Sequence, residues 1–138
     1  MKRSLVLLAV TAALSACAIT TREATTELPG TSWVLVELDG AEPVGASAPS
    51  IVFAEDGTVS GSTGCNTFSG TATIDGSSVE LGPLATTRMA CTDEAAGAQE
   101  QAFLLALDGV TSYTIDEEGR LVLEGGAPLV FEVAAADG

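Results

Sequence analysis

Three turn signals rich in Asp and Gly divide much of this sequence into short runs of strand-forming residues, and they constrain the fold more than any other feature. Two of them are Asp56-Gly57 and Asp75-Gly76, and the third is the acidic stretch Asp116 to Gly119. Such residues tolerate the positive φ angles of tight hairpin turns, and the flanking runs are rich in β-branched residues. The sequence therefore predicts three antiparallel hairpins.

Further strands and one helix complete the predicted domain. Residues 33–38 form a β-branched and aromatic run that starts with Trp33, which we expect to anchor the core, and residues 129–133 form the last strand. Residues 93–107 predict the helix, with Thr92 or Asp93 as its N-cap and Gly109 at its C-terminal end. Its expected buried stripe consists of Ala95, Ala98, Ala102, Leu105 and Ala106, extended by Phe103 and Leu107. The pattern predicts an α+β domain, mainly antiparallel, of about eight short strands.

The N-terminus resembles an export signal. Lys2 and Arg3 precede an apolar run of ten residues, from Leu5 to Leu14. This run is too short for a transmembrane helix, which needs roughly 20 residues, but is typical of a signal peptide.

The end of this run, Leu14-Ser15-Ala16-Cys17, resembles the lipobox of bacterial lipoproteins, in which the cysteine is lipidated and becomes the first mature residue. We therefore expect a lipoprotein signal peptide at residues 1–16, a lipidated tether at 17–29 and a folded domain at 30–134. An ordinary secretory signal, cut next to Cys17, is the alternative.

The charge of the expected mature chain excludes several classes of function. Removal of residues 1–16 leaves three arginines against nineteen carboxylates, a net charge of −16. This charge argues against nucleic acid and against electrostatic binding to anionic lipid. The mature part has no histidine and no lysine, and so lacks the commonest general base, the Schiff-base nucleophile and the imidazole metal ligand.

The remaining cysteines, Cys65 and Cys91, form an even pair if lipid occupies Cys17. In an exported protein such a pair predicts a disulfide. Two buried free thiols are the alternative, because sequence does not show whether the geometry permits the bond.

Two residues beside these cysteines are candidate partner contacts. Asn66 lies in an irregular stretch between Gly64 and Gly70, where its side chain either satisfies the amides of a turn or contacts a ligand. Arg88 either contacts a partner or makes a charge-assisted hydrogen bond to a carboxylate of the domain.

No set of residues predicts catalysis, a cofactor or a metal. Asp116, Glu117 and Glu118 offer carboxylates for acid–base work, but acidic runs that end in Gly are typical of solvated turns. Neither cysteine has a histidine to activate it. The acidic turns lack the ligand spacing of a calcium loop, and two cysteines without histidine do not complete a structural zinc site. We therefore expect a protein that is not an enzyme.

The motifs follow one another in the order of a known family. After the Trp33 strand come Gly61-x-x-Gly64-Cys65-Asn66-x-Phe68-x-Gly70, then Leu84-Ala85-x-Thr87-Arg88-Met89-Ala90-Cys91, then a helix with Glu100-x-x-Phe103-Leu104. This series resembles the META/HslJ-like family (DUF306 domain) over about residues 29–133. The resemblance implies antiparallel strands that curl as an incomplete barrel around one helix. It brings no established catalytic residues and implies an envelope lipoprotein associated with stress or antibiotic tolerance.

These observations favour a non-catalytic binding or scaffolding module, exported and lipid-anchored to a bacterial membrane. We expect a monomer that binds an unidentified envelope protein, at a groove beside the helix or at an open sheet edge. The alternative is a carrier that holds a small apolar ligand inside a cup-shaped β-barrel.

Overall fold

The computed structural model of the chain describes residues 27–135, so the predicted signal peptide, Cys17 and most of the predicted tether lie outside the described residues. Leu28, at the end of the predicted tether, is fully buried, and the packed domain therefore begins before residue 30. The elements in chain order are β1 (Thr31–Leu38), β2 (Ser50–Phe53), β3 (Thr58–Ser62), β4 (Thr67–Asp75), β5 (Ser78–Leu81), β6 (Ala85–Thr86), α1 (Glu94–Asp108), β7 (Ser112–Ile115), β8 (Leu121–Glu124) and β9 (Leu129–Val133).

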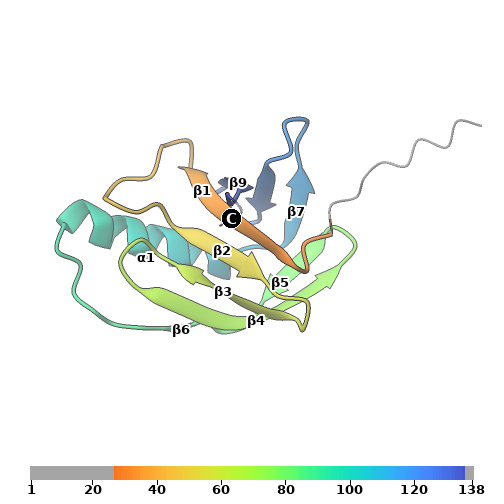
Figure 1. Ribbon diagram of the computed structural model, residues 1–138, viewed down its shortest axis with the longest axis horizontal. Coiled ribbons are helices and arrows are strands. Elements are labelled where there is room, and N and C mark those ends of the chain that lie inside the picture. Colours follow the sequence, from red (N-terminus) through yellow and green to blue (C-terminus); the bar gives the residue numbers. More distant parts are fainter. Residues whose placement is uncertain (1–26, 136–138) are drawn as a thin grey trace, which may run out of the picture.

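The strands form one antiparallel sheet that curls until its ends meet (Figure 1). The strand order is β3-β2-β1-β9-β8-β7-β5-β4-β6, and an additional pairing of β3 with β4 closes eight strands into a ring. Closure is uneven, because β5 and β7 share the single register pair Ser78↔Ser112. The ring is therefore not a regular barrel. It confirms the predicted α+β fold of an incomplete barrel with one helix.

The three predicted hairpins are confirmed as the pairs β2–β3, β4–β5 and β7–β8. At the first turn, the Asp56 carboxylate accepts hydrogen bonds from the backbone N–H and the hydroxyl of Thr58, at 3.0 and 2.7 Å. These bonds, with that from the hydroxyl the larger effect, hold the pKa of Asp56 below its ordinary value. Gly57 has a φ of 86°, which glycine adopts without steric cost.

Side chains fill the inside of the ring. Trp33 is 2 % exposed and confirms its expected place in the core. The Phe103 ring of α1 packs edge-on against Phe68 of β4, with centroids 5.9 Å apart. The other fully buried large side chains come from the strands, α1 and residue 28: Leu28, Leu35, Ile51, Phe53, Val59, Leu107, Leu121, Leu123, Leu129 and Phe131.

The helix buries only part of the predicted apolar stripe. Phe103, Ala106 and Leu107 are buried as predicted, whereas Ala95, Ala98 and Ala102 are exposed and Leu105 is 73 % exposed. The sequence offers two apolar faces, and the face with the larger side chains buries more surface. The predicted stripe is therefore confirmed at Phe103, Ala106 and Leu107 and wrong at Ala95, Ala98, Ala102 and Leu105.

Two glycines are required by close backbone approaches. A Cβ on Gly61 of β3 would lie 2.0 Å from the Ser50 carbonyl oxygen, and a glycine inside a strand is typical of such a close backbone approach. Gly109 ends α1 with a φ of −89°, not in the left-handed conformation of a typical C′ glycine. Its Cβ would lie 3.0 Å from the Gly126 Cα, so packing explains this glycine.

Candidate functional site

Cys65 and Cys91 meet beside the beginning of α1. The structure joins them in a disulfide that spans 26 positions of sequence, with their Cα atoms 5.7 Å apart. The bond ties the β3–β4 turn to the segment that enters the helix. Free thiols are not the arrangement that the structure shows, and the oxidation state of the two cysteines in the cell stays a prediction.

The Asn66 side chain is 2 % exposed and uses its hydrogen-bonding groups within the chain. Its Oδ1 accepts from the Thr87 hydroxyl at 3.0 Å and from the Met89 backbone N–H at 2.7 Å. Its Nδ2 donates to the Met89 carbonyl at 3.1 Å and to the Glu100 carboxylate at 2.9 Å. An amide has two donor hydrogens and two acceptor lone pairs, so this side chain has no hydrogen bond left to offer a partner.

Through its two bonds to Met89, the Asn66 side chain pairs with this residue as the backbone of a neighbouring strand would. Next to it, the Thr87 backbone N–H donates to the Thr67 carbonyl at 3.0 Å, and the Thr67 N–H donates to the Thr87 hydroxyl at 3.0 Å. Backbone groups on an antiparallel strand face alternately toward and away from the partner strand. Those of Thr87 and Met89 therefore face inward, and those of Thr86 and Arg88 face outward.

Glu100 closes this network from α1. The buried Thr63 hydroxyl accepts from the Asn66 backbone N–H at 2.8 Å and makes a short hydrogen bond to the Glu100 carboxylate. A hydroxyl carries one proton, and a carboxylate is the stronger acceptor, so Thr63 donates to Glu100. The carboxylate thus has two donors inside the protein, Thr63 and Asn66.

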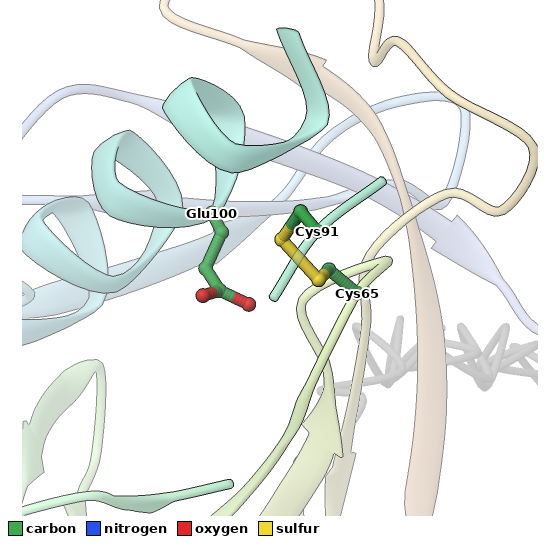
Figure 2. A group of neighbouring side chains, drawn as sticks. All are labelled: Cys65, Cys91 and Glu100. Atoms are coloured by element: carbon green, nitrogen blue, oxygen red, sulfur yellow. A yellow bond between two sulfur atoms is a disulfide. The ribbon is translucent and has the colours of Figure 1, made fainter. Parts of the chain in front are cut away.

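Glu100 also lies beside the disulfide. One potential ligand atom from each of Cys65, Cys91 and Glu100 lies within 4.8 Å of the others, and Figure 2 shows Glu100 reaching from α1 toward the two sulfur atoms. Metal binding by cysteine requires the thiolate, and here the two sulfurs are bonded to each other. In this state the cluster is a covalent clasp and not a metal centre.

Two surface hollows border the segment between β6 and α1. The larger, which we call the 84–90 groove, has a volume of about 690 Å³ and is lined by residues 84–90 together with Asn66, Glu100 and Leu104. The smaller, of about 400 Å³, has the disulfide in its wall and shares Met89 and Ala90 with the first. Both volumes lie in the range of ligand sites.

The profile of the META domain matches residues 26–136. The chain belongs to the META domain family. Among curated protein sequences, no relative matches the chain. No helix within residues 27–135 combines the length and the apolar character needed to cross a membrane.

Solved structures share the META fold seen here. The chain is similar to a protein from Burkholderia xenovorans solved by NMR, with 26% identity and a TM-score of 0.62, over 78% of this chain and 84% of that one. A second NMR structure has 25% identity and a TM-score of 0.65, over 80% and 95% of the two chains. A DUF4847 family protein from Bacteroides vulgatus, with 19% identity, a TM-score of 0.53 and 80% and 96% coverage, shares the fold alone.

The two predicted partner contacts of the META domain occupy different environments. Asn66 is buried and fully bonded, which favours the turn-holding role that the sequence also offered. Arg88 is exposed in the 84–90 groove. The ion pairs among residues 27–135 belong to Arg120, which contacts Asp116 at 2.7 Å and Glu118 at 3.6 Å. Within this part of the chain, the predicted bond from Arg88 to a domain carboxylate is not found.

The acidic turn that offered candidate carboxylates is held by its own hydrogen bonds. Desolvation raises the pKa of Asp116. Hydrogen bonds from the Arg120 N–H, the Arg120 guanidinium and the Glu118 N–H, with the positive charge of Arg120, lower it by more, so the pKa lies below its ordinary value of 3.8. The hydrogen bonds to Asp116 hold the turn, and its lowered pKa does not suit a general acid, which needs a raised one.

Sequence reasoning missed Thr63 and Glu100 as members of the Asn66 network. One signal was available, because Glu100 lies three and seven residues before Phe103 and Leu107, on the buried face of α1. A carboxylate on that face needs hydrogen-bond donors. The sequence did not identify them, because Thr63 and Asn66 lie more than thirty positions away.

Proposed function

We propose that this META domain protein is a non-catalytic binding or scaffolding module, anchored by lipid to a bacterial membrane, with a role in envelope stress or antibiotic tolerance. Its partner would be another protein of the envelope. The observation that carries the proposal is the 84–90 groove. There residues 87–90 are all exposed, directly before Cys91 of the disulfide.

The internal bonding of the site supports binding over catalysis. Asn66, Thr63 and Glu100 donate to and accept from one another, so their polar groups serve the shape of the groove. The exposed side chains of the groove include those of Arg88 and Met89, with Met89 67 % exposed. Exposed apolar and arginine side chains are common anchors of protein interfaces.

The membrane anchor rests on the sequence Leu14-Ser15-Ala16-Cys17. From Cys17 to the buried Leu28, an extended chain spans at most about 40 Å, which would keep the domain close to the membrane. A mass spectrum of the native protein, before and after reduction, reports the lipid on Cys17 and the oxidation of Cys65 and Cys91 together. An unmodified Cys17 would exclude the anchor.

The carrier alternative gains no comparable support. A carrier holds its ligand inside the barrel, but here the inside of the ring is occupied by core side chains that include Trp33, Phe103 and Phe131. We therefore retain the binding module alone.

Site-specific photo-crosslinking in cells tests the binding face. A photoreactive phenylalanine derivative at the exposed Ala85, in the groove, should capture one specific envelope protein. The same derivative at Ala127, an exposed residue between β8 and β9, is the control and should not. Capture of the same set of neighbours from both positions would contradict the proposal.

A further inference from the structure

We infer that the partner binds as an extended peptide strand, which pairs with the outer edge of residues 86–90 and places a carboxylate against Arg88. The inference rests on the proposed function, because it takes the 84–90 groove as the binding face. It adds the conformation of the partner and the chemistry that would recognise it.

The outer edge of this segment is a free sheet edge. β6 ends the strand order, so no strand of residues 27–135 pairs with its outer side. The inward bonds of Thr87 and Met89 leave the backbone N–H and C=O of Thr86 and Arg88 facing away from β4. An unpaired edge of this kind accepts an added strand.

Asn66 makes this edge longer than the two residues of β6. β6 itself ends at Thr86, but the bonds from the Asn66 side chain to both backbone groups of Met89 hold the segment beside the start of β4 as far as Met89. The disulfide at Cys91 fixes the far end of the segment. The edge is therefore held in a binding-competent shape before any partner arrives, which lowers the entropy cost of binding.

Charge selects the kind of partner. Residues 27–135 contain two cations, of which Arg120 is paired with Asp116 and Glu118. Arg88 lies exposed on the free edge, and an arginine guanidinium binds a carboxylate in a two-pronged geometry. A second copy of the chain is a poor occupant, since edge-to-edge pairing would bring two Arg88 side chains onto one short ladder.

The groove also favours apolar residues beside that carboxylate. Leu84 and Leu104 are half-buried in its walls, and Met89 is exposed. Successive side chains of a strand point to opposite faces. We therefore expect a peptide with an Asp or Glu that binds Arg88 and with apolar residues at alternating positions that contact Leu84, Leu104 and Met89.

The test uses phage-displayed random peptides of about twelve residues, selected on the full chain. Peptides with this pattern should be enriched. Their affinity should fall about tenfold for Thr86→Pro, which removes an outward N–H and keeps the inward bonds. Thr86→Val keeps the N–H and is the matched control, with affinity near that of the wild type. Thermal unfolding confirms that each variant is folded.

The charge contact is tested by exchange. Arg88→Ala should weaken the peptides about tenfold, whereas Arg120→Ala should not. A peptide whose acid is replaced by Lys should bind Arg88→Glu better than the wild type. Unchanged affinity for Thr86→Pro, or enrichment of no peptide, would overturn the inference. Specific crosslinking from Ala85 would then still support the proposed function, so the two failures are distinguishable.

Discussion

Replacement of Asn66 by Ala removes the side chain that holds the 84–90 segment to the sheet. The variant loses hydrogen bonds to Thr87, to Glu100 and to both backbone groups of Met89. Four bonds at about 1 kcal/mol each give an upper value of about 4 kcal/mol. Water replaces part of this at the exposed Thr87 and Met89, so we expect the free energy of unfolding to fall by about 3 kcal/mol.

Asn66→Asp separates the donors of this side chain from its acceptors. The substitution keeps the acceptors for Thr87 and the Met89 N–H but places a second carboxylate about 3 Å from that of Glu100. At neutral pH it should destabilise the domain at least as much as Asn66→Ala. Its effect should shrink at acidic pH, where protonation of one carboxyl group restores a donor.

Urea unfolding measures these effects, followed by the fluorescence of the single, buried Trp33. Ser69→Ala, at an exposed position of β4, is the control and should change the free energy of unfolding by less than about 0.5 kcal/mol. A loss for Asn66→Ala no larger than that of the control would refute the argument. So would a pH-independent effect of Asn66→Asp.

Three further predictions concern the disulfide, two glycines and the acidic turn. Cys65→Ser and Cys91→Ser should each lower the free energy of unfolding by about 3 kcal/mol, and the double variant should lose little more; additive losses in urea unfolding would show that the cysteines are not partners. Gly61→Ala should destabilise the domain by about 3 kcal/mol, because the new Cβ would collide with the Ser50 carbonyl oxygen of β2. Gly97→Ala in α1 should instead stabilise it by up to about 1 kcal/mol. Effects of the same sign for the two variants would contradict this account of the packing. Because the folded-state pKa of Asp116 is lowered, its stabilisation is present above 3.8 and is lost as the pH falls further. Asp116→Asn should therefore lower the melting temperature at about pH 6 but not at about pH 2, and equal losses at both would count against the ion pair.

The fold was predictable where local signals and long-range packing agree. Asp56-Gly57 and the other turns specify hairpins because the turn and both strands lie within a few residues. The buried face of α1 was not predictable from alanine spacing, since Leu105 and Leu107 both fit an apolar stripe and only the sheet decides between them. The sequence predicts an irregular stretch between Gly64 and Gly70, but β4 already starts at Thr67, because Cys65 and Asn66 obscure the strand pattern.

The candidate site was predictable in part. The even number of remaining cysteines predicts the pairing of Cys65 with Cys91, and the family motifs contain Asn66 and Glu100. The contacts that connect these residues could not be predicted, because the Asn66 side chain makes the hydrogen bonds to Met89 that the backbone of a neighbouring strand would otherwise make. No pattern of residue types predicts that a side chain will take the role of backbone in this way. The open edge that it creates became visible only in the arrangement of β4 and β6.

Amide hydrogen exchange of the free chain, resolved by NMR, tests the central claim most directly. If Asn66 completes the sheet and leaves its outer edge open, the amides of Thr87 and Met89 should be protected, while those of Thr86 and Arg88 should exchange rapidly. Asn66→Ala should remove the protection at Met89. Uniformly rapid exchange from Thr86 to Met89, or protection at Arg88, would contradict the account.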